Sequence, residues 1–317
     1  MQAYIVKRLL QAVPLLLLVT FATYSLILIL PGDPVLALFT GGEASLDEEQ
    51  LAAARAKLGL DKPLPVQYAL WLKRALQGDL GVSTQTSREV TEELTKRLPV
   101  TAQVGLTALF FSLLISVPAG VLSAVWRNSL LDRVVTVFSV AGAAMPSFWI
   151  GMLLILLLSV RLHLLPPVGY VSFLEDPLRA LKLMAMPCLV LGWQAAAVIT
   201  RQTRSAVLEV LREDYVRTAY AKGLRQLRVI GLHVLRNALL PVVTVVGLLI
   251  GPLLAGSVIV EQMFAIPGVG RLLVSAVLAQ DFPTVQGVVL VVAVAVVTAN
   301  LLTDLAYAVL DPRIRYR

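Results

Sequence analysis

Charged side chains are scarce in this chain. Asp, Glu, Lys and Arg make up 15% of its 317 residues, while 58% of the residues are hydrophobic. Soluble globular proteins carry about 25% charged and about 45–50% apolar residues. The mean hydropathy of +0.82 agrees with this imbalance. The composition excludes an ordinary soluble domain and indicates a protein built for a lipid environment.

Cysteine and histidine are almost absent as well. Cys188 is the only cysteine, so no internal disulfide bond can form, and its apolar surroundings favour a small core residue. The two histidines, His163 and His233, are expected on opposite membrane faces, where they cannot share a metal ion or a catalytic triad. We therefore expect no metal site and no catalytic residues.

Nucleotide-binding motifs are missing too. No G-x-x-x-x-G-K-[ST] occurs, and PGVG (267–270) lacks the third glycine and the strand-to-helix setting of a dinucleotide site. The chain itself is expected to bind no cofactor.

Long uncharged runs dominate what remains. A helix needs about 20 apolar residues to cross a bilayer core of about 30 Å. Six runs without Asp, Glu, Lys, Arg or His approach or exceed that length, namely Leu9–Leu30, Val100–Val125, Val134–Val160, Leu183–Thr200, Asn237–Val260 and Phe282–Thr303. They do not alternate apolar with polar residues as barrel strands do. The predicted fold is an all-α integral membrane protein with six transmembrane helices.

The first run could instead be a cleaved signal peptide. Its 22 residues exceed the usual apolar core of about 7–15 residues, and no small-x-small site closes it. We expect residues 1–30 to form a short cytoplasmic N-terminus and a retained first span.

The basic residues indicate the orientation. With six spans both termini lie on one side, and fifteen of the Lys and Arg residues fall there, against four in the short loops of the other side. Positive charge marks the cytoplasmic side. Both termini are therefore expected in the cytoplasm of a bacterial inner membrane. The net charge of +7 reports topology, and no nucleic-acid partner is predicted.

Two segments are expected outside the lipid on the opposite face. Residues 31–99 form an extracytoplasmic insert, with one helix from Ser45 to about Lys57 and a second over Val66–Leu76 that ends at GDLG (78–81). A docking surface and a cap over the helix bundle both remain open for it. Residues 261–281 contain a short apolar run, Leu272–Leu278, which suggests a re-entrant or interfacial helix, with an inert loop as the alternative. The core spans 100–310, and 311–317 is a cytoplasmic tail.

Residues 201–236 form the long cytoplasmic loop. Its apolar residues recur at helical spacing and predict one amphipathic helix, with Val207, Leu208, Leu211, Tyr215 and Ala219 on one face. Gly223 can take a positive φ and end that helix. Pro241 is expected in the first turns of the fifth span. The loop could be a lever gripped by a partner protein or a helix lying on anionic lipid.

Eight stretches of the chain support a resemblance. EDYVRTAYAKGL (213–224) with LRNALLP (235–241) resembles the cytoplasmic "EAA" loop of binding-protein-dependent ABC importer permeases, in the form of the dipeptide, oligopeptide, glutathione and nickel branch. The similarity continues in LPGDP (30–34), LGLDKPLPVQY (58–68), GDLGVS (78–83), IVEQMFAIPGVGRLL (259–273), DFPTVQG (281–287) and DPRIR (311–315).

This resemblance implies a permease subunit whose coupling helix docks on a nucleotide-binding subunit. The motif's Ala and Gly fall on Ala219 and Gly223, and Arg217 stands where the motif has a leading Glu. The residues implied in coupling are Arg217, Thr218, Ala219, Ala221, Lys222 and Gly223. The implied partners are a second homologous permease, two ATPase subunits that hold ATP and Mg²⁺, and an extracytoplasmic solute-binding protein.

Polar, small and aromatic residues within the spans are candidates for the translocation path, although small residues serve helix packing equally well. The candidates are Met145, Phe148, Trp149, Gly251, Ser257 and Glu261, with a kink expected at Met145 and Pro146. The cargo stays open between dipeptides, longer peptides, glutathione, nickel complexes and some oligosaccharides. An ion-coupled secondary transporter is the alternative class, although the ionisable residues at mid-membrane and internal repeats typical of such carriers are not evident.

Overall fold

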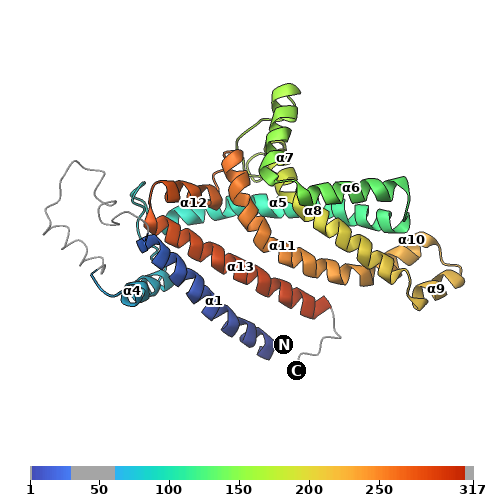
Figure 1. Ribbon diagram of the computed structural model, residues 1–317, viewed down its shortest axis with the longest axis horizontal. Coiled ribbons are helices and arrows are strands. Elements are labelled where there is room, and N and C mark those ends of the chain that lie inside the picture. Colours follow the sequence, from blue (N-terminus) through green and yellow to red (C-terminus); the bar gives the residue numbers. More distant parts are fainter. Residues whose placement is uncertain (1, 30–60, 311–317) are drawn as a thin grey trace. The chain divides into compact units, whose positions relative to one another are not determined.

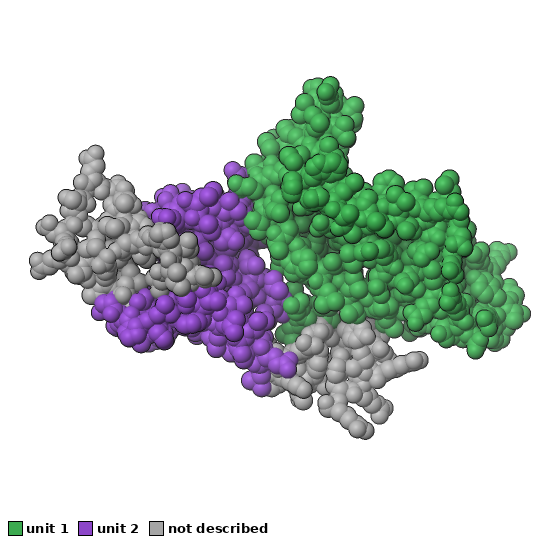
Figure 2. Space-filling view, in the orientation of Figure 1, with its two compact units in different colours: residues 1, 101–266, 298–317 green, residues 2–100, 267–297 purple. Residues whose placement is uncertain are grey.

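The computed structural model describes residues 2–29 and 61–310, with the side chains of 10–25 and 61–303. Within these ranges the chain is helical, and the only strand-like pairing is an isolated bridge between Val82 and Glu89. The chain divides into two compact units (Figure 2). One comprises residues 101–266 and 298–317 with Met1, and the other comprises residues 2–100 and 267–297.

In the second unit, α1 (Gln2–Ile29) packs on α4 (Leu64–Leu76) through aromatic rings. Tyr68 meets Phe21 edge-on, with ring centroids 5.2 Å apart, and its hydroxyl lies 2.8 Å from the Thr20 hydroxyl. The predicted helix over Val66–Leu76 is confirmed and starts two residues earlier. Gly78 follows it with φ +87°, as expected of a glycine that ends a helix. The helix predicted from Ser45 and the LPGDP turn lie outside the described residues.

The same unit contains the short helix expected in the 261–281 segment. It is α12 (Val269–Leu278), which packs against the beginnings of α5 (Val90–Val125) and α13 (Phe282–Leu310). Their shared apolar cluster consists of Leu80, Val90, Leu94, Val269, Leu272 and Val288. Gly287 allows this approach, because a Cβ there would lie 2.7 Å from a Val90 methyl carbon.

The first unit holds the remaining helices. They are α6 (Leu130–Ala144), α7 (Ser147–Leu154), the π-helix η1 (Ile155–Arg161), α8 (Pro177–Val210), α9 (Asp214–Ala221), α10 (Gln226–Arg228), the π-helix η2 (Val229–Val234) and α11 (Leu235–Met263). The later part of α5 and the end of α13 complete it.

The predicted third span is two helices at a sharp angle rather than one straight helix. The expected kink is present: α6 and the helix formed by α7 and η1 meet at 110° (Figure 1). Pro146 explains the break, because proline lacks an amide hydrogen and forces the preceding residue out of helical geometry. Met145 accordingly has ψ 130°.

Four described helices are long and apolar enough to cross a membrane, or five when the bent pair counts as one. The described apolar stretch of α1, Leu10–Ser25, is shorter. Several helices extend beyond the apolar runs that predicted them, because helices continue past the lipid boundary. Thus α8 exceeds Leu183–Thr200 at both ends, and a continuous helix leads from Gln226 into α11. Pro241 lies in the first two turns of α11, as predicted, although the helical stretch from Gln226 precedes it.

Candidate functional site

The long loop predicted as a coupling element folds as two helices around a turn. α8 ends at Val210, residues 211–213 turn the chain, and α9 begins at Asp214. The expectation of one amphipathic helix from Val207 to Ala219 was therefore wrong. The turn also shifts the buried face. Val216 is fully buried, whereas Tyr215, predicted for that face, is 41% exposed and accepts a hydrogen bond from the Asn237 amide at 2.8 Å.

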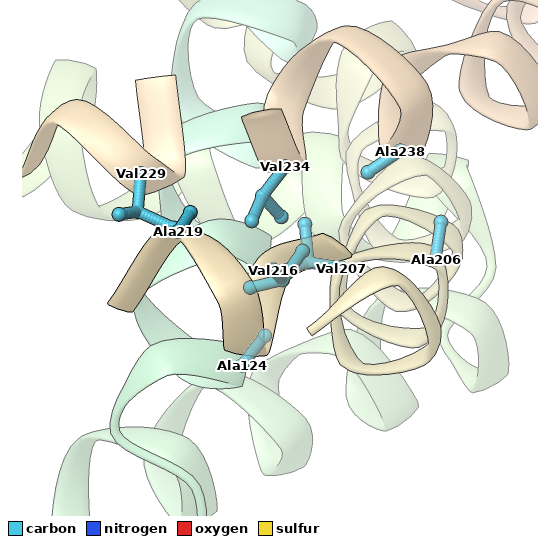
Figure 3. Close-up of a cluster of buried hydrophobic side chains, with 8 residues drawn as sticks. All are labelled: Ala124, Ala206, Val207, Val216, Ala219, Val229, Val234 and Ala238. Atoms are coloured by element: carbon cyan, nitrogen blue, oxygen red, sulfur yellow. The ribbon is translucent and has the colours of Figure 1, made fainter. Parts of the chain in front are cut away.

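The inner face of α9 rests on a set of small side chains that we call the base cluster (Figure 3). Val216 and Ala219 of α9 point toward residues of α5, α8, η2 and α11. The cluster consists of Ala124, Ala206, Val207, Val216, Ala219, Val229, Val234 and Ala238. Because all eight are valine or alanine, the helices approach closely and leave little room for α9 to move independently.

Gly223 ends α9 as predicted. Its φ is +77°, its amide donates to the Tyr220 carbonyl at 2.9 Å, and the Leu224 amide reaches back to Ala219 at 3.3 Å. This pair of bonds is the Schellman arrangement, which satisfies the last carbonyls of a helix. A Cβ at Gly223 would meet nothing within 4 Å, so the backbone angle rather than space requires glycine.

The outer face of α9 carries most of the predicted coupling residues. Arg217, Thr218, Ala221, Lys222 and Gly223 are exposed, whereas Ala219 is buried in the base cluster. Arg217 lies 3.5 Å from Asp214, and both side chains are largely exposed. Such a surface pair contributes little to stability, so the guanidinium can exchange partners at low cost.

An ion pair that sequence reasoning missed lies beside the base cluster. Arg204 of α8 donates to both carboxylate oxygens of Asp132 in α6, from Nε at 2.7 Å and from a terminal nitrogen at 2.9 Å. The same carboxylate accepts hydrogen bonds from the Ser123 hydroxyl of α5 and the Asn128 amide. Ser129 caps α6 by accepting from the Asp132 amide at 3.2 Å. The Ser-x-x-Asp pattern could have predicted this cap, but nothing in it points to Arg204.

The six predicted path residues differ in exposure, and Met145 and Gly251 are half-buried. Ser257 and Glu261 are buried one turn apart on α11, and Glu261 accepts a hydrogen bond from Thr101 at 2.7 Å. Phe148 and Trp149 lie exposed on α7. A cavity of about 300 Å³ lies among α6, α7, α8 and α11 and is lined by neighbours of the predicted residues. Those lining it include Ser147, Gln194, Pro252 and Gly256.

The two histidines lie in different elements. His163 lies after η1 and His233 lies in η2. Among the described residues, no three His, Cys, Asp or Glu side chains gather as metal ligands would.

Comparison with known proteins identifies the family of the chain. Residues 116–316 match the family described as binding-protein-dependent transport system inner membrane component, and residues 1–105 match its N-terminal family. The chain is 43% identical to the dipeptide transport system permease protein DppB of Escherichia coli strain K12, over the full length of both. It is 42% identical, again over both full lengths, to a putative peptide transport system permease protein of Brucella abortus and to the di/tripeptide permease DppB of Pseudomonas aeruginosa.

A solved structure shares the fold. A chain of the inward-facing MetNI methionine ABC transporter superposes with a TM-score of 0.55 at 18% identity, covering 69% of this chain and 96% of that one. The full-length relatives and the family match over most of the sequence lead to one conclusion. This chain belongs to the family of binding-protein-dependent transport system inner membrane components, the permease subunits of ABC importers.

Proposed function

We propose that this chain carries short peptides across the inner membrane as one permease subunit of an ATP-driven importer. The observation that carries the cargo assignment is the full-length identity of 42–43% to permeases named for dipeptides, di/tripeptides and peptides. The names of these relatives give no support to an ion-coupled carrier.

The proposed topology has six spans with both termini in the cytoplasm. Four long helices, the bent pair of α6 with α7 and η1, and α1 supply the six. The excess of basic residues in the α8–α11 connection supports a cytoplasmic position for α9. Residues 31–99 and 261–281 then face outward, where a solute-binding protein would deliver the cargo.

α9 is the proposed coupling helix. Its outer face offers Arg217, Thr218, Ala221 and Lys222 to a groove on an ATPase subunit, while Val216 and Ala219 fasten it to the base cluster. This two-sided arrangement suits force transmission, because one face can be gripped and the other is packed against helices that enter the membrane. ATP and Mg²⁺ are held by two such ATPase subunits, and a second homologous permease completes the membrane domain.

The proposed path runs beside α7 and α11. Met145, Phe148 and Trp149 contribute from the bent pair, and Gly251, Ser257 and Glu261 contribute from α11. Support comes from the 110° break at Pro146 and from Glu261, because a buried carboxylate in a spanning helix is costly and usually functional.

Cross-linking tests this function directly. With Ala221→Cys in the assembled complex, a bifunctional thiol reagent should join this chain to an ATPase subunit that carries a cysteine in its docking groove. Cysteine at exposed Leu174, in the loop between η1 and α8, is the matched control and should give no such product. A purified complex that contains no ATPase subunit, or no uptake of the labelled dipeptide Gly-Leu by the complete reconstituted system, would overturn the proposal.

A further inference from the structure

The contact between Asp132 and Arg204 joins three helices at one point. Arg204 comes from α8 and Asp132 from the first turn of α6, while the Ser123 hydroxyl from α5 donates to the same carboxylate. With the second guanidinium bond and the Asn128 amide, both carboxylate oxygens accept two hydrogen bonds each. The Asp132 side chain is 6% exposed and that of Arg204 is 29% exposed. A planar bidentate pair of this kind fixes orientation as well as distance.

The position of this contact along the chain gives it a mechanical context. Arg204 lies in the last two turns of α8, directly before the turn into α9. Ala206 and Val207, two and three residues further on, belong to the base cluster that holds α9, as does Ala124, which follows Ser123. Asp132 lies at the start of α6, whose other end reaches the 110° break at Pro146. The ion pair is therefore a short connection between the base of α9 and the bent pair.

Packing alone also joins these helices. A Cβ at Gly120 of α5 would lie 2.7 Å from the Thr200 carbonyl oxygen of α8, and one at Gly142 of α6 would lie 2.8 Å from Ala197 of α8. These close approaches would survive the loss of the ion pair and hold the fold together. The ion pair adds a constraint on the relative sliding and rotation of the two helices. Either movement of α8 against the start of α6 would break at least one of the two hydrogen bonds of the pair.

We propose that Asp132 and Arg204 are positioning residues for coupling, which make the start of α6 follow α8 when an ATPase subunit moves α9. This inference rests on the proposed function and adds a route to it. The displacement passes from α9 through the base cluster to α8, then through the carboxylate–guanidinium contact to α6 and the break at Met145 and Pro146. Neither residue touches substrate or nucleotide in this assignment.

Hydrogen exchange on the complete complex separates this role from a merely structural one. In the wild type, ATP binding should change amide exchange both in α9 and in Leu130–Ala144. In Asp132→Asn, a nearly isosteric change, the response of α9 should remain while that of α6 is lost. An α6 response that persists in the variant would overturn the inference. No response of α9 in the wild type would instead contradict the proposed function, so the two failures are distinguishable.

Transport stoichiometry supplies the second readout. Asp132→Asn should lower the amount of Gly-Leu taken up per ATP hydrolysed by about fivefold, within the range that coupling substitutions reach. Arg204→Gln should lower the ratio by a similar factor. The double variant should lower it no further than the more impaired single variant does, because both substitutions remove the same contact. Additive losses, or uptake and hydrolysis that fall in proportion, would contradict the inference. Glu92→Gln, which breaks the exposed pair with Lys96, is the matched control and should leave the ratio unchanged.

Discussion

Ser83 and Asp281 lie 198 positions apart, yet the Ser83 hydroxyl donates a hydrogen bond to the Asp281 carboxylate. Both side chains are buried. Asp281 also accepts from the Thr84 amide at 3.2 Å and, as the residue before α13, from the Thr284 hydroxyl at 2.7 Å. Two motifs noted separately in the sequence, GDLGVS and DFPTVQG, are therefore two halves of one contact.

Asp281→Ala should destabilise the unit that holds α12 and the beginning of α13. The change removes a helix cap and leaves several buried donors without their acceptor, so we expect a loss of about 2 kcal/mol or more. Thermal unfolding of the purified protein in detergent, followed by circular dichroism, measures it. Asp79→Ala is the control, because Asp79 accepts from the Gly81 amide in an exposed loop. Equal melting temperatures for the two variants would contradict the assigned cap.

Val216→Ala and Tyr215→Ala distinguish the observed register of α9 from the one predicted by spacing. Val216 is fully buried in the base cluster, and removing its methyl groups should cost about 1–2 kcal/mol through the cavity left behind. Tyr215→Ala loses only an exposed hydrogen bond and some surface contact, so its effect on unfolding should be smaller. Thermal unfolding in detergent ranks the two variants, and a larger loss in Tyr215→Ala would show that α9 is rotated from the position described.

Thr101→Val tests the hydrogen bond to the buried carboxylate of Glu261. Valine keeps the shape of threonine but removes the donor that lies 2.7 Å from the Glu261 oxygen. Removing a hydrogen-bond donor from a buried carboxyl group should cost about 1–3 kcal/mol. Thr101→Ser retains the hydroxyl and should stay near the wild type in the same unfolding measurement. Thr95→Val, which affects only an exposed bond to the Glu92 carbonyl, provides a second reference.

Sequence patterns predicted what depends on local chemistry. Long uncharged runs located α5, α8, α11 and α13, because the cost of placing charge in hydrocarbon is large and applies along the whole run. Gly223 was identified as a helix end because only a residue tolerant of positive φ suits that position.

Two features escaped prediction for physical reasons. The turn at residues 211–213 interrupts an apolar spacing that continues on both sides of it, so periodicity could not locate the break or show that Val216 replaces Tyr215 in the core. The pairing of Arg204 with Asp132 joins residues 72 positions apart, and each alone resembles an ordinary charge near a membrane surface. Only the packing of α6 on α8 brings them together.

Gly223→Asp should uncouple transport from ATP hydrolysis without preventing assembly. The backbone there has φ +77°, which costs about 1 kcal/mol for a residue with a Cβ, and the open surroundings leave room for the side chain. The new negative charge stands beside Lys222 on the face proposed to meet the ATPase subunit, so it should pair with Lys222 and weaken docking. We expect normal amounts of complex in the membrane, continued ATP hydrolysis and a loss of Gly-Leu uptake. Gly223→Asn adopts the same backbone readily and adds no charge, so it should keep most of the uptake. If both variants lose uptake equally, the added negative charge is not the cause of the loss. The end of α9 would then require glycine itself, for a close contact or for flexibility.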